Sequence, residues 1–416
     1  MIARRLSARW LLPIEAPPVE RGAVLLGPDG RIAAVGPEAR VPRPAEVPVE
    51  DFGDALLLPG LINTHTHLEL TGMGGDPPEP EFAAWIRRLR EAKAALAAET
   101  FLSAARQGLA DCWAAGVTTV ADTGDSGAVV QALAEAGGSG IAYQEVFGPH
   151  PDQYDECLRG LQGKVEALSR FAAGRVRLGV SPHAPYTVSG PLYRATAAWA
   201  MANALPIAVH LAESPAESAL LSSATGSFAE AWRGRGIPMP SPLGHSPVQW
   251  LDEHGVLSER TLCIHLVQAT GLDIGRLANA GAAVAHCPLS NRRHGHGEAP
   301  LAALLAARVR VGVGTDSVVS VGELDLLADA RAARSLAGLD AAQALALCTL
   351  GAARALGLDA EIGGLRVGKW GDCVVIRFPS AGARRAPEEV ALASGPRDVV
   401  ATYVGGRDVY RNSQPS

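Results

Sequence analysis

The stretch LLLPGLINTHTHLEL, residues 56–70, decides the fold class. It starts as an apolar run and ends in His65-Thr66-His67, so two imidazoles follow directly on buried residues. Residues two apart on a strand lie on one face of it, so both histidines point in the same direction. The stretch therefore predicts a buried β-strand that carries two polar side chains to its carboxyl end.

Seven further runs of this kind follow, separated by longer helical stretches such as FLSAARQGLADCWAAG (101–116). They are TTVADTG (118–124), IAYQEVFG (141–148), VRLGVSPHA (176–184), PIAVHLAES (206–214), TLCIHLVQA (261–269), AAVAHCPLSN (282–291) and VRVGVGTDS (309–317). Short buried strands that alternate with helices imply parallel strands joined by crossover helices. Together with the first run, 56–67, they make eight units, which predict a closed (β/α)8 barrel of the TIM type.

The two ends of the chain have a different pattern. Residues 20–36 predict a β-hairpin around Pro28-Asp29-Gly30, where glycine supplies a positive φ. The segments 367–378 and 399–411 are predicted strand pairs around Gly-rich turns. We therefore predict a small β-sandwich module built from both termini, residues 1–55 and 362–416, beside a barrel over residues 56–361.

Composition and charge limit the partners of this chain. Its 416 residues are 48% apolar and 19% charged, enough to bury a barrel and a smaller module. A net charge of −6 does not favour nucleic acid as a partner. No stretch reaches the roughly 18 apolar residues of a membrane span, and the six separated cysteines fit free thiols in a reducing compartment. We expect a cytoplasmic protein that acts on a small molecule, without a nucleic-acid or membrane partner.

Polar side chains gather at the carboxyl ends of the eight runs, the end that faces the active site in such a barrel. His65 and His67 end the first run, His210 lies in the fifth, and Asp316 lies in the eighth. Barrel closure brings the eighth strand beside the first. Three imidazoles and one carboxylate suit Zn²⁺, and also Fe²⁺ or Mn²⁺. The sequence thus predicts a site for one divalent metal ion.

The segments PGLINTHTHLE, SPHAPYTVS, HLAES, CIHL, AHCPLSN and GTDS resemble the amidohydrolase superfamily, and within it the branch of nucleoside and nucleobase deaminases and chlorohydrolases. The resemblance covers nearly the whole chain. It implies His65, His67, His210 and Asp316 as metal ligands, with zinc as the expected ion. A binuclear site would need a carboxylated lysine at the end of the fourth strand, where VSPHAP has none, so one metal is favoured. A homodimer is expected only by analogy with the family.

The same resemblance implies the residues that move protons. Glu213, three residues after His210, is the expected general acid and base, and the alternative is a glutamate favoured by a helix dipole. His265 is expected to orient the attacking hydroxide and to stabilise the oxyanion. Asp316 would accept a proton from water as well as bind the metal. His183 is the expected substrate contact, with a structural loop role as the alternative.

Further residues are candidates for substrate binding. Glu69, two residues after His67, is interpreted as a contact to substrate hydroxyls or amine, or else as a surface or supporting carboxylate. Trp85 begins a helix that can cover the pocket, where stacking and core packing are both open. His294 and His296 form a second His-x-His in a Gly-flanked loop. We interpret this as a positively charged, substrate-facing loop and not as a metal site.

Within the branch, HTHLEL, the loop leading to FAAWI (82–86) and NRRHGHGEAPLAALL (291–305) look most like aminodeoxyfutalosine deaminases of the alternative menaquinone pathway. This likeness implies deamination of a 6-aminopurine nucleoside. Hydroxide supplied by the metal would attack C6, Glu213 would protonate the ring nitrogen, and ammonia would leave. Arg292 or Arg293 would meet the benzoate carboxylate of the substrate.

Two other kinds of function stay open. The same site would serve S-adenosylhomocysteine or methylthioadenosine deamination, guanine or cytosine deamination, or hydrolytic dechlorination of a triazine. A non-catalytic scaffold with this fold is the other alternative. Such proteins lose ligands, so the retention of His65, His67 and the other candidate residues argues against it.

Overall fold

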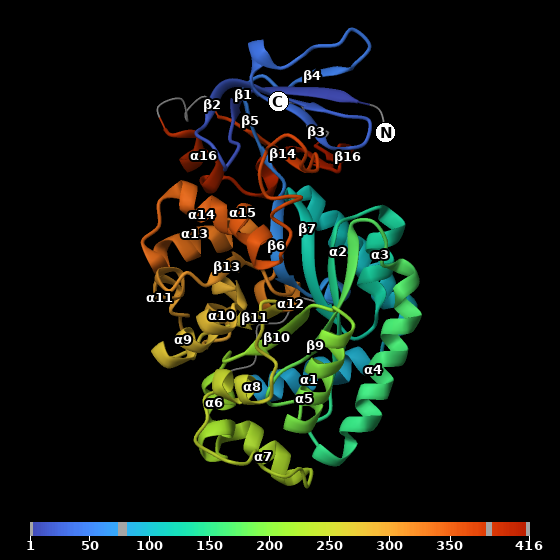
Figure 1. The fold of residues 1–416 in the computed structure, drawn as a ribbon, viewed down its shortest axis with the longest axis vertical. Helices are drawn as coiled ribbons and strands as arrows, with labels where there is room; N and C mark the ends of the chain where they lie inside the picture. The colour runs from blue at the N-terminus through green and yellow to red at the C-terminus, as the bar shows by residue number, and fades with distance from the viewer. Residues whose placement is uncertain (1–2, 74–80, 380–384, 413–416) are drawn as a thin grey trace.

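The computed structural model describes residues 3–73, 81–379 and 385–412. Within these residues the strands form two eight-stranded sheets, one closed into a barrel and one mixed. Figure 1 shows the mixed sheet at one end of the molecule, where both chain termini lie, and the barrel with its helices below it.

The barrel sheet is wholly parallel, and its strands follow one another in chain order. The strands are β6 (Leu61–Thr66), β7 (Val117–Gly124), β8 (Gly140–Val146), β9 (Val176–Pro182), β10 (Ile207–Leu211), β11 (Thr261–His265), β12 (Ala283–His286) and β13 (Arg310–Val313). This order confirms the predicted (β/α)8 barrel.

Closure of the barrel joins β13 to β6. The Asp316 backbone N–H donates to the His65 carbonyl over 3.0 Å, and the Asn63 side chain donates to Thr315 Oγ1 over 2.8 Å. A Cβ on Gly314 would lie 2.7 Å from the His65 backbone nitrogen, so only glycine permits this approach. Gly314 therefore allows Asp316 to lie next to His65 and His67.

Helices surround the barrel, and most cross from one strand to the next (Figure 1). They are α1 (Phe82–Ala94), α2 (Ala98–Ala114), α3 (Ala128–Ala136), α4 (Tyr154–Leu168), α5 (Gly190–Ala202), α6 (Pro215–Ser223), α7 (Gly226–Gly234), α8 (Pro247–Glu253), α9 (Gly271–Ala280), α10 (Pro288–Arg293), α11 (Leu301–Ala306), α12 (Val318–Val321), α13 (Leu326–Ala337), α14 (Ala341–Leu347), α15 (Leu350–Ala355) and α16 (Pro387–Ala393). No helix among the described residues is long and apolar enough to cross a membrane.

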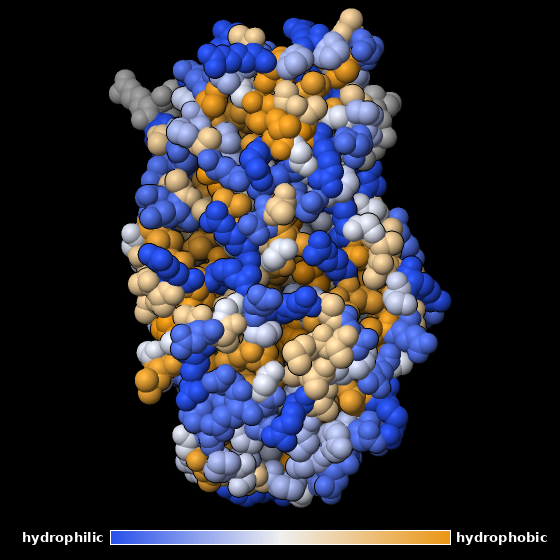
Figure 2. Space-filling model, viewed as in Figure 1, coloured by the Kyte–Doolittle hydropathy of each residue, from blue (hydrophilic) through white to orange (hydrophobic). Residues whose placement is uncertain are grey.

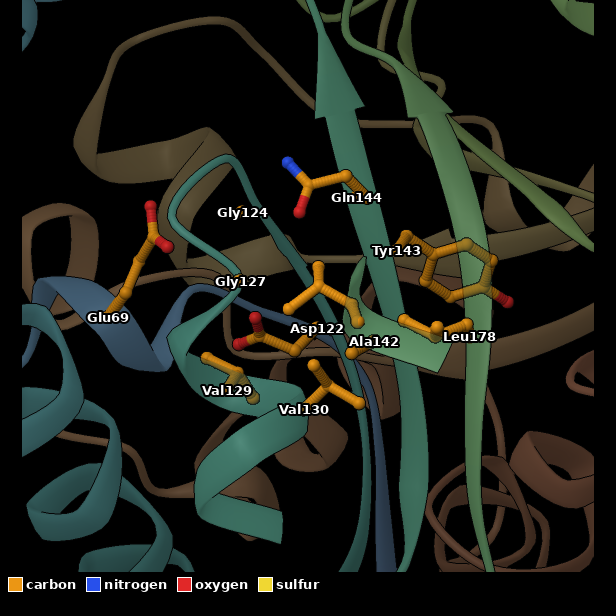
Figure 3. Close-up of a pocket in the computed structure, with 11 residues that line it drawn as sticks. Glu69, Asp122, Gly124, Gly127, Val129, Val130, Ala142, Tyr143, Gln144 and Leu178 are labelled. Atoms are coloured by element: carbon orange, nitrogen blue, oxygen red, sulfur yellow. The ribbon is translucent and has the colours of Figure 1, made fainter. Parts of the chain in front are cut away.

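Alternate residues of each barrel strand pack on opposite sides of the sheet, as the two-residue period of a strand requires. Ile62, Ile141 and Tyr143 belong to the apolar cluster inside the barrel, whereas Leu61, Val120 and Ala142 belong to the layer under the helices. A small pocket lies beside β7 and β8, and Figure 3 shows Asp122 and Gln144 among its lining residues. On the face drawn in Figure 2, hydrophobic side chains lie in separate patches between hydrophilic ones.

The mixed sheet combines strands from both ends of the chain. Its order is β16-β15-β14-β5-β1-β2-β3, with β4 beside β1. The strands are β1 (Arg4–Leu11), β2 (Val19–Leu26), β3 (Ile32–Pro37), β4 (Val49–Asp51), β5 (Ala55–Pro59), β14 (Cys373–Arg377), β15 (Val399–Val404) and β16 (Arg407–Arg411). The predicted hairpin over 20–36 is confirmed as the antiparallel pair β2 and β3.

Two details of the predicted strands are wrong. The run 56–67 is not one barrel strand, because it divides at Gly60 into β5 of the mixed sheet and β6 of the barrel. The Gly60 backbone N–H instead donates to the Asp372 carbonyl over 2.9 Å. The segment 367–378 contains only one strand, β14, and not a strand pair, since residues 368–371 bond to the backbone of residues 30–32 around an isolated antiparallel bridge between Arg31 and Trp370.

Candidate active site

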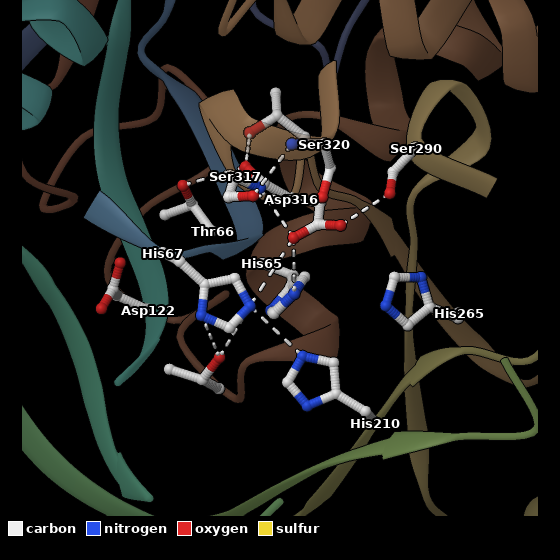
Figure 4. A network of polar contacts seen from close by, with 12 residues as sticks. His65, Thr66, His67, Asp122, His210, His265, Ser290, Asp316, Ser317 and Ser320 are labelled. Carbon is white, nitrogen blue, oxygen red and sulfur yellow. Dashed lines mark hydrogen bonds and ion pairs between the residues drawn. The ribbon is translucent and has the colours of Figure 1, made fainter. Parts of the chain in front are cut away.

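The four predicted metal ligands converge at the carboxyl ends of the barrel strands (Figure 4). His65 lies one residue before the end of β6 and His67 directly follows that strand, His210 lies in β10, and Asp316 follows β13. The Nε2 atoms of His65 and His67 each lie 3.6 Å from Asp316 Oδ1. His210 Nε2 lies 3.3 Å from His67 Nε2. Strands far apart in the chain therefore place four donor side chains around one point.

The donor set fits a divalent metal ion. Both ring nitrogens of His65 are buried and have no hydrogen-bond partner among the described residues, which is costly for a polar group unless a ligand is bound. Ligand atoms of His65, His67 and Asp316 lie within 4.8 Å of one another, and so do those of His65, His210 and His265. Imidazole nitrogens with one carboxylate are typical of zinc and related ions.

Burial sets the protonation of these ligands. It lowers the pKa of His65, it lowers the pKa of His67 to about 3, and it lowers the pKa of His210 well below the usual value. Burial alone would raise the pKa of Asp316, but the nearby His65 and His67 side chains hold that pKa well below its ordinary value. Neutral imidazoles and an ionised carboxylate are the forms that bind metal.

Two neighbours orient the Asp316 carboxylate. Ser290 Oγ donates to Oδ2 over 2.6 Å, and the Ser317 backbone N–H donates to Oδ1 over 2.7 Å (Figure 4). Asp316 itself has a φ of 63°, a strained conformation for a residue with a side chain, and such residues cluster at functional sites. The sequence analysis assigned no role to Ser290, although it lies in the CPLSN segment.

Glu213 follows β10 and is held by the start of α6. The backbone N–H groups of Ala212 and Glu213 donate to the two carboxylate oxygens of Glu217, over 2.8 and 2.9 Å. Ser214 caps α6 by accepting from the Glu217 N–H, and Pro215 occupies the first turn. The sequence ESPAE is thus a helix start that fixes the backbone of the predicted acid and base.

The Glu213 carboxylate is 4% exposed and lies among polar rings. Its Oε1 is 3.7 Å from His265 Nε2 and 3.4 Å from His296 Nε2, and the Tyr186 hydroxyl donates to Oε2 over 3.4 Å. Burial alone would raise the pKa of Glu213, but His265 and His296 lower it to about 2. The carboxylate is therefore ionised at neutral pH and can accept a proton.

His265 lies at the end of β11, where the structure gives its side chain a defined orientation. Its Nδ1 lies 2.9 Å from the Asn291 side-chain oxygen. An amide oxygen only accepts hydrogen bonds, so Nδ1 carries the proton, which leaves Nε2 facing the ligand cluster and Glu213. The predicted position of His265 beside the reacting groups agrees with this geometry, and Asn291 is a support that the sequence analysis did not assign.

His183 lies at the edge of the cluster. Its ring centroid is 4.7 Å from that of His210, and its Nδ1 is 2.8 Å from Thr187 Oγ1. Glu145 of β8 faces the same two histidines, and its buried Oε1 has no hydrogen-bond partner among the described residues. The sequence analysis did not single out Glu145. In IAYQEVFG, residues two apart lie on the same face of the strand, so the inward-facing Tyr143 indicates that Glu145 faces inward as well.

Glu69 and Trp85 lie outside the ligand cluster. Glu69 is 1% exposed, which excludes the surface interpretation, and its carboxylate accepts from Lys93 Nζ over 2.6 Å and from the Ser126 backbone N–H over 3.2 Å. Figure 3 shows it beside the turn that contains Gly124. Trp85 is 7% exposed and packs with Phe82 in an apolar cluster. Residues 74–80 of the loop before Phe82 lie outside the described residues.

The predicted substrate-facing loop divides into two parts. Arg292 is exposed in the last turn of α10 and lines a pocket with His286 and Gly295, and none of the predicted metal ligands lines that pocket. His296, by contrast, is 6% exposed and lies against Glu213. The His296 end of this loop therefore belongs to the group of side chains around Glu213.

Comparison with known proteins gives a consistent result. Residues 56–409 match the Amidohydrolase family. The chain is 30% identical to a 5-methylthioadenosine/S-adenosylhomocysteine deaminase of Moorella thermoacetica over 377 residues, 88% of this chain and 83% of that one. It is 33% identical to an aminodeoxyfutalosine deaminase of Deinococcus radiodurans over 348 residues, 77% of each chain. An adenosine deaminase structure from Xanthomonas campestris with bound zinc superimposes with a TM-score of 0.83 at 26% identity, covering 98% of this chain and 92% of that one.

Proposed function

This chain belongs to the amidohydrolase family, and we propose that it hydrolytically deaminates a 6-aminopurine nucleoside with the help of one divalent metal ion. The observation that carries the proposal is the convergence of His65, His67, His210 and Asp316 beside an ionised, buried Glu213. Relatives named as deaminases of adenine nucleosides support the substrate class. Zinc is the metal we propose, and the zinc-containing structural relative supports that choice.

When held by His65, His67, His210 and Asp316, a divalent metal would lower the pKa of water toward about 7 and so would make hydroxide available at neutral pH. Glu213, ionised at rest, accepts a proton from the attacking water and delivers it to the ring nitrogen beside C6. His265, with its proton on Nδ1, presents Nε2 to orient the nucleophile. Asp316 takes the remaining proton and passes it to the amino group, so ammonia leaves C6 as a neutral molecule.

For the substrate we propose aminodeoxyfutalosine, which places the protein in menaquinone biosynthesis by the futalosine route. The relative from Deinococcus radiodurans and the segments HTHLEL and NRRHGHGEAPLAALL support this choice. Methylthioadenosine and S-adenosylhomocysteine are the second candidates, because the relative from Moorella thermoacetica is named for them. In either case His183 faces the ligand cluster and is the residue we propose to contact the substrate.

Ammonia release tests the proposal directly. The zinc-loaded protein is assayed with aminodeoxyfutalosine, methylthioadenosine, S-adenosylhomocysteine and adenosine, with metal content measured on the same sample. We expect aminodeoxyfutalosine to have the highest kcat/KM. A preference for methylthioadenosine or S-adenosylhomocysteine would replace the first substrate with the second. No release from any aminopurine nucleoside by metal-replete protein would contradict nucleoside deamination.

A further inference from the structure

We infer that His296 is a positioning residue for Glu213: its Nε2–H holds the Glu213 carboxylate in the orientation from which protons are transferred. The inference rests on the proposed function, because it gives a role to a residue beside the proposed acid and base. His296 lies in the segment predicted to be a substrate-facing loop, and in the structure its ring is directed at the Glu213 carboxylate inside the site.

The contact is buried, and it is shorter than the 3.7 Å between His265 Nε2 and the same Glu213 oxygen. His296 Nε2 lies 3.4 Å from Glu213 Oε1, and the His296 side chain is 4% exposed. Nε2 forms no hydrogen bond of regular geometry with any described residue. A buried N–H without a partner is costly, and the Glu213 carboxylate is the acceptor within reach. Catalytic hydrogen bonds are often long before substrate binds and shorten in the complex.

The loop is built to hold the ring in this place. The His296 backbone N–H donates to the Asn291 carbonyl over 3.0 Å, and Gln268 Nε2 donates to the His296 carbonyl over 2.8 Å. Gly295 and Gly297 on either side have φ values of 69° and 108°, which glycine adopts without strain. The backbone therefore turns inward at His296, and hydrogen bonds hold both its N–H group and its carbonyl group.

Ring packing restricts the side chain as well. The Phe82 ring from α1 meets the His296 ring edge to face, with 4.5 Å between the ring centroids. The His294 ring stacks on the His296 ring with a centroid distance of 5.3 Å and an interplanar angle of 12°. A ring enclosed in this way keeps Nε2 directed at Glu213. The role resembles that of the outer groups that orient metal ligands, whose loss typically costs about 10- to 100-fold in activity.

Three single variants test the inference. His296→Phe keeps the ring packing and removes the donor, whereas His296→Gln keeps a donor near the position of Nε2. His254→Phe is the matched control, because among the described residues the His254 ring contacts Trp250 and not Glu213. We expect kcat to fall about 10- to 100-fold in His296→Phe, with KM and metal content unchanged. His296→Gln should recover most of this loss, and His254→Phe should keep kcat within about threefold.

Wild-type kcat in His296→Phe, or an equal loss in His296→Phe and His296→Gln, would overturn the inference. A second measurement needs no turnover: ¹⁵N-edited imidazole spectra of the resting protein should show His296 with its proton on Nε2, and a proton on Nδ1 would overturn the inference. Because the spectrum does not depend on substrate, failure of the proposed function, seen as no ammonia release by wild type, is distinguished from failure of the inference.

Discussion

At the scale of the residue, the chemistry depends on how Glu213 and Asp316 are kept ionised inside a buried site. Burial alone would raise both pKa values, and nearby histidines lower them. Backbone N–H groups and short hydroxyl contacts then set their directions. In the proposed mechanism Glu213 transfers protons, and Asp316 both binds the metal and transfers a proton.

Replacing Glu213 with glutamine should separate metal binding from turnover. Glu213→Gln keeps the shape of the side chain but cannot accept a proton, so kcat should fall by about 10² to 10⁴-fold while metal content stays at the wild-type level. Ammonia release and metal analysis on one sample measure both. Glu230→Gln, at an exposed position of α7, is the control. Full activity in Glu213→Gln would remove Glu213 from the acid and base role.

Asp316 should be needed for the metal itself. Asp316→Ala removes a carboxylate that lies 3.6 Å from both His65 and His67 Nε2, so metal content and activity should fall together. Asp359→Ala changes an exposed aspartate and should leave both unchanged. Inductively coupled plasma analysis after dialysis gives the metal content. Unchanged metal in Asp316→Ala would show that this carboxylate is not a ligand.

At the scale of the element, Glu50 joins four strands of the mixed sheet. From β4 it accepts from Arg4 of β1 over 3.0 Å, from Tyr403 of β15 over 2.8 Å and from Arg411 of β16 over 2.6 Å. Burial alone would raise its pKa, but the Arg411 and Tyr403 hydrogen bonds outweigh burial and lower it. The charged form is therefore the one that stabilises the sheet.

This lowered pKa predicts how stability depends on pH. Glu50→Gln should lower the free energy of unfolding by about 1 kcal/mol near pH 7, a modest value because the cluster is partly exposed to solvent. The wild-type advantage is fully present above the ordinary glutamate pKa of 4.5 and is lost as the pH falls through the lower folded-state value. Urea unfolding from about pH 7 to about pH 4 measures it. An advantage that widens on acidification would contradict this assignment.

At the scale of the whole molecule, a few buried contacts hold the mixed sheet to the barrel. Arg175, which precedes β9, forms an ion pair with Asp372, which precedes β14. Asp372 Oδ1 also accepts from the Gly405 N–H over 2.7 Å. We propose that the two ends of the chain act as one module and the segment between them as the barrel, with residues 56–59 of β5 on the module side of the predicted boundary at 55/56. The junction lies at the amino ends of the barrel strands, the face of such barrels that serves stability.

Breaking this junction should lower stability without impairing catalysis. Asp372→Ala leaves the Arg175 side chain, 13% exposed, without its buried partner, at a cost of about 3 kcal/mol. Asp155→Ala breaks an exposed i,i+4 pair with Arg159 and should cost less than about 1 kcal/mol. Denaturant unfolding measures the difference, and kcat should match wild type in both variants. Equal stability of the two variants would contradict a structural role for the junction.

The barrel and the position of its candidate metal ligands could be predicted from the sequence. Eight buried runs that alternate with helical stretches are compatible with few folds other than a parallel barrel. Polar residues at the ends of its strands do not contribute to the apolar core, so they indicate a functional site. The grouping of His65, His67, His210 and Asp316 could therefore be predicted before any distance was known. Their assignment as metal ligands stays a prediction that the variants above test.

The other side chains that contact this site could be identified only from the tertiary structure. The order of residues does not show that β5 leaves the barrel for the mixed sheet, since Gly60 interrupts the run without changing its apolar pattern. Nor does it show that Lys93 meets Glu69, or that His296 meets Glu213, from segments 24 and 83 residues away along the chain. The path of a loop depends on packing between elements that are distant in the sequence. Because the local periodicity of the sequence does not contain this information, such contacts can be identified only in the folded structure.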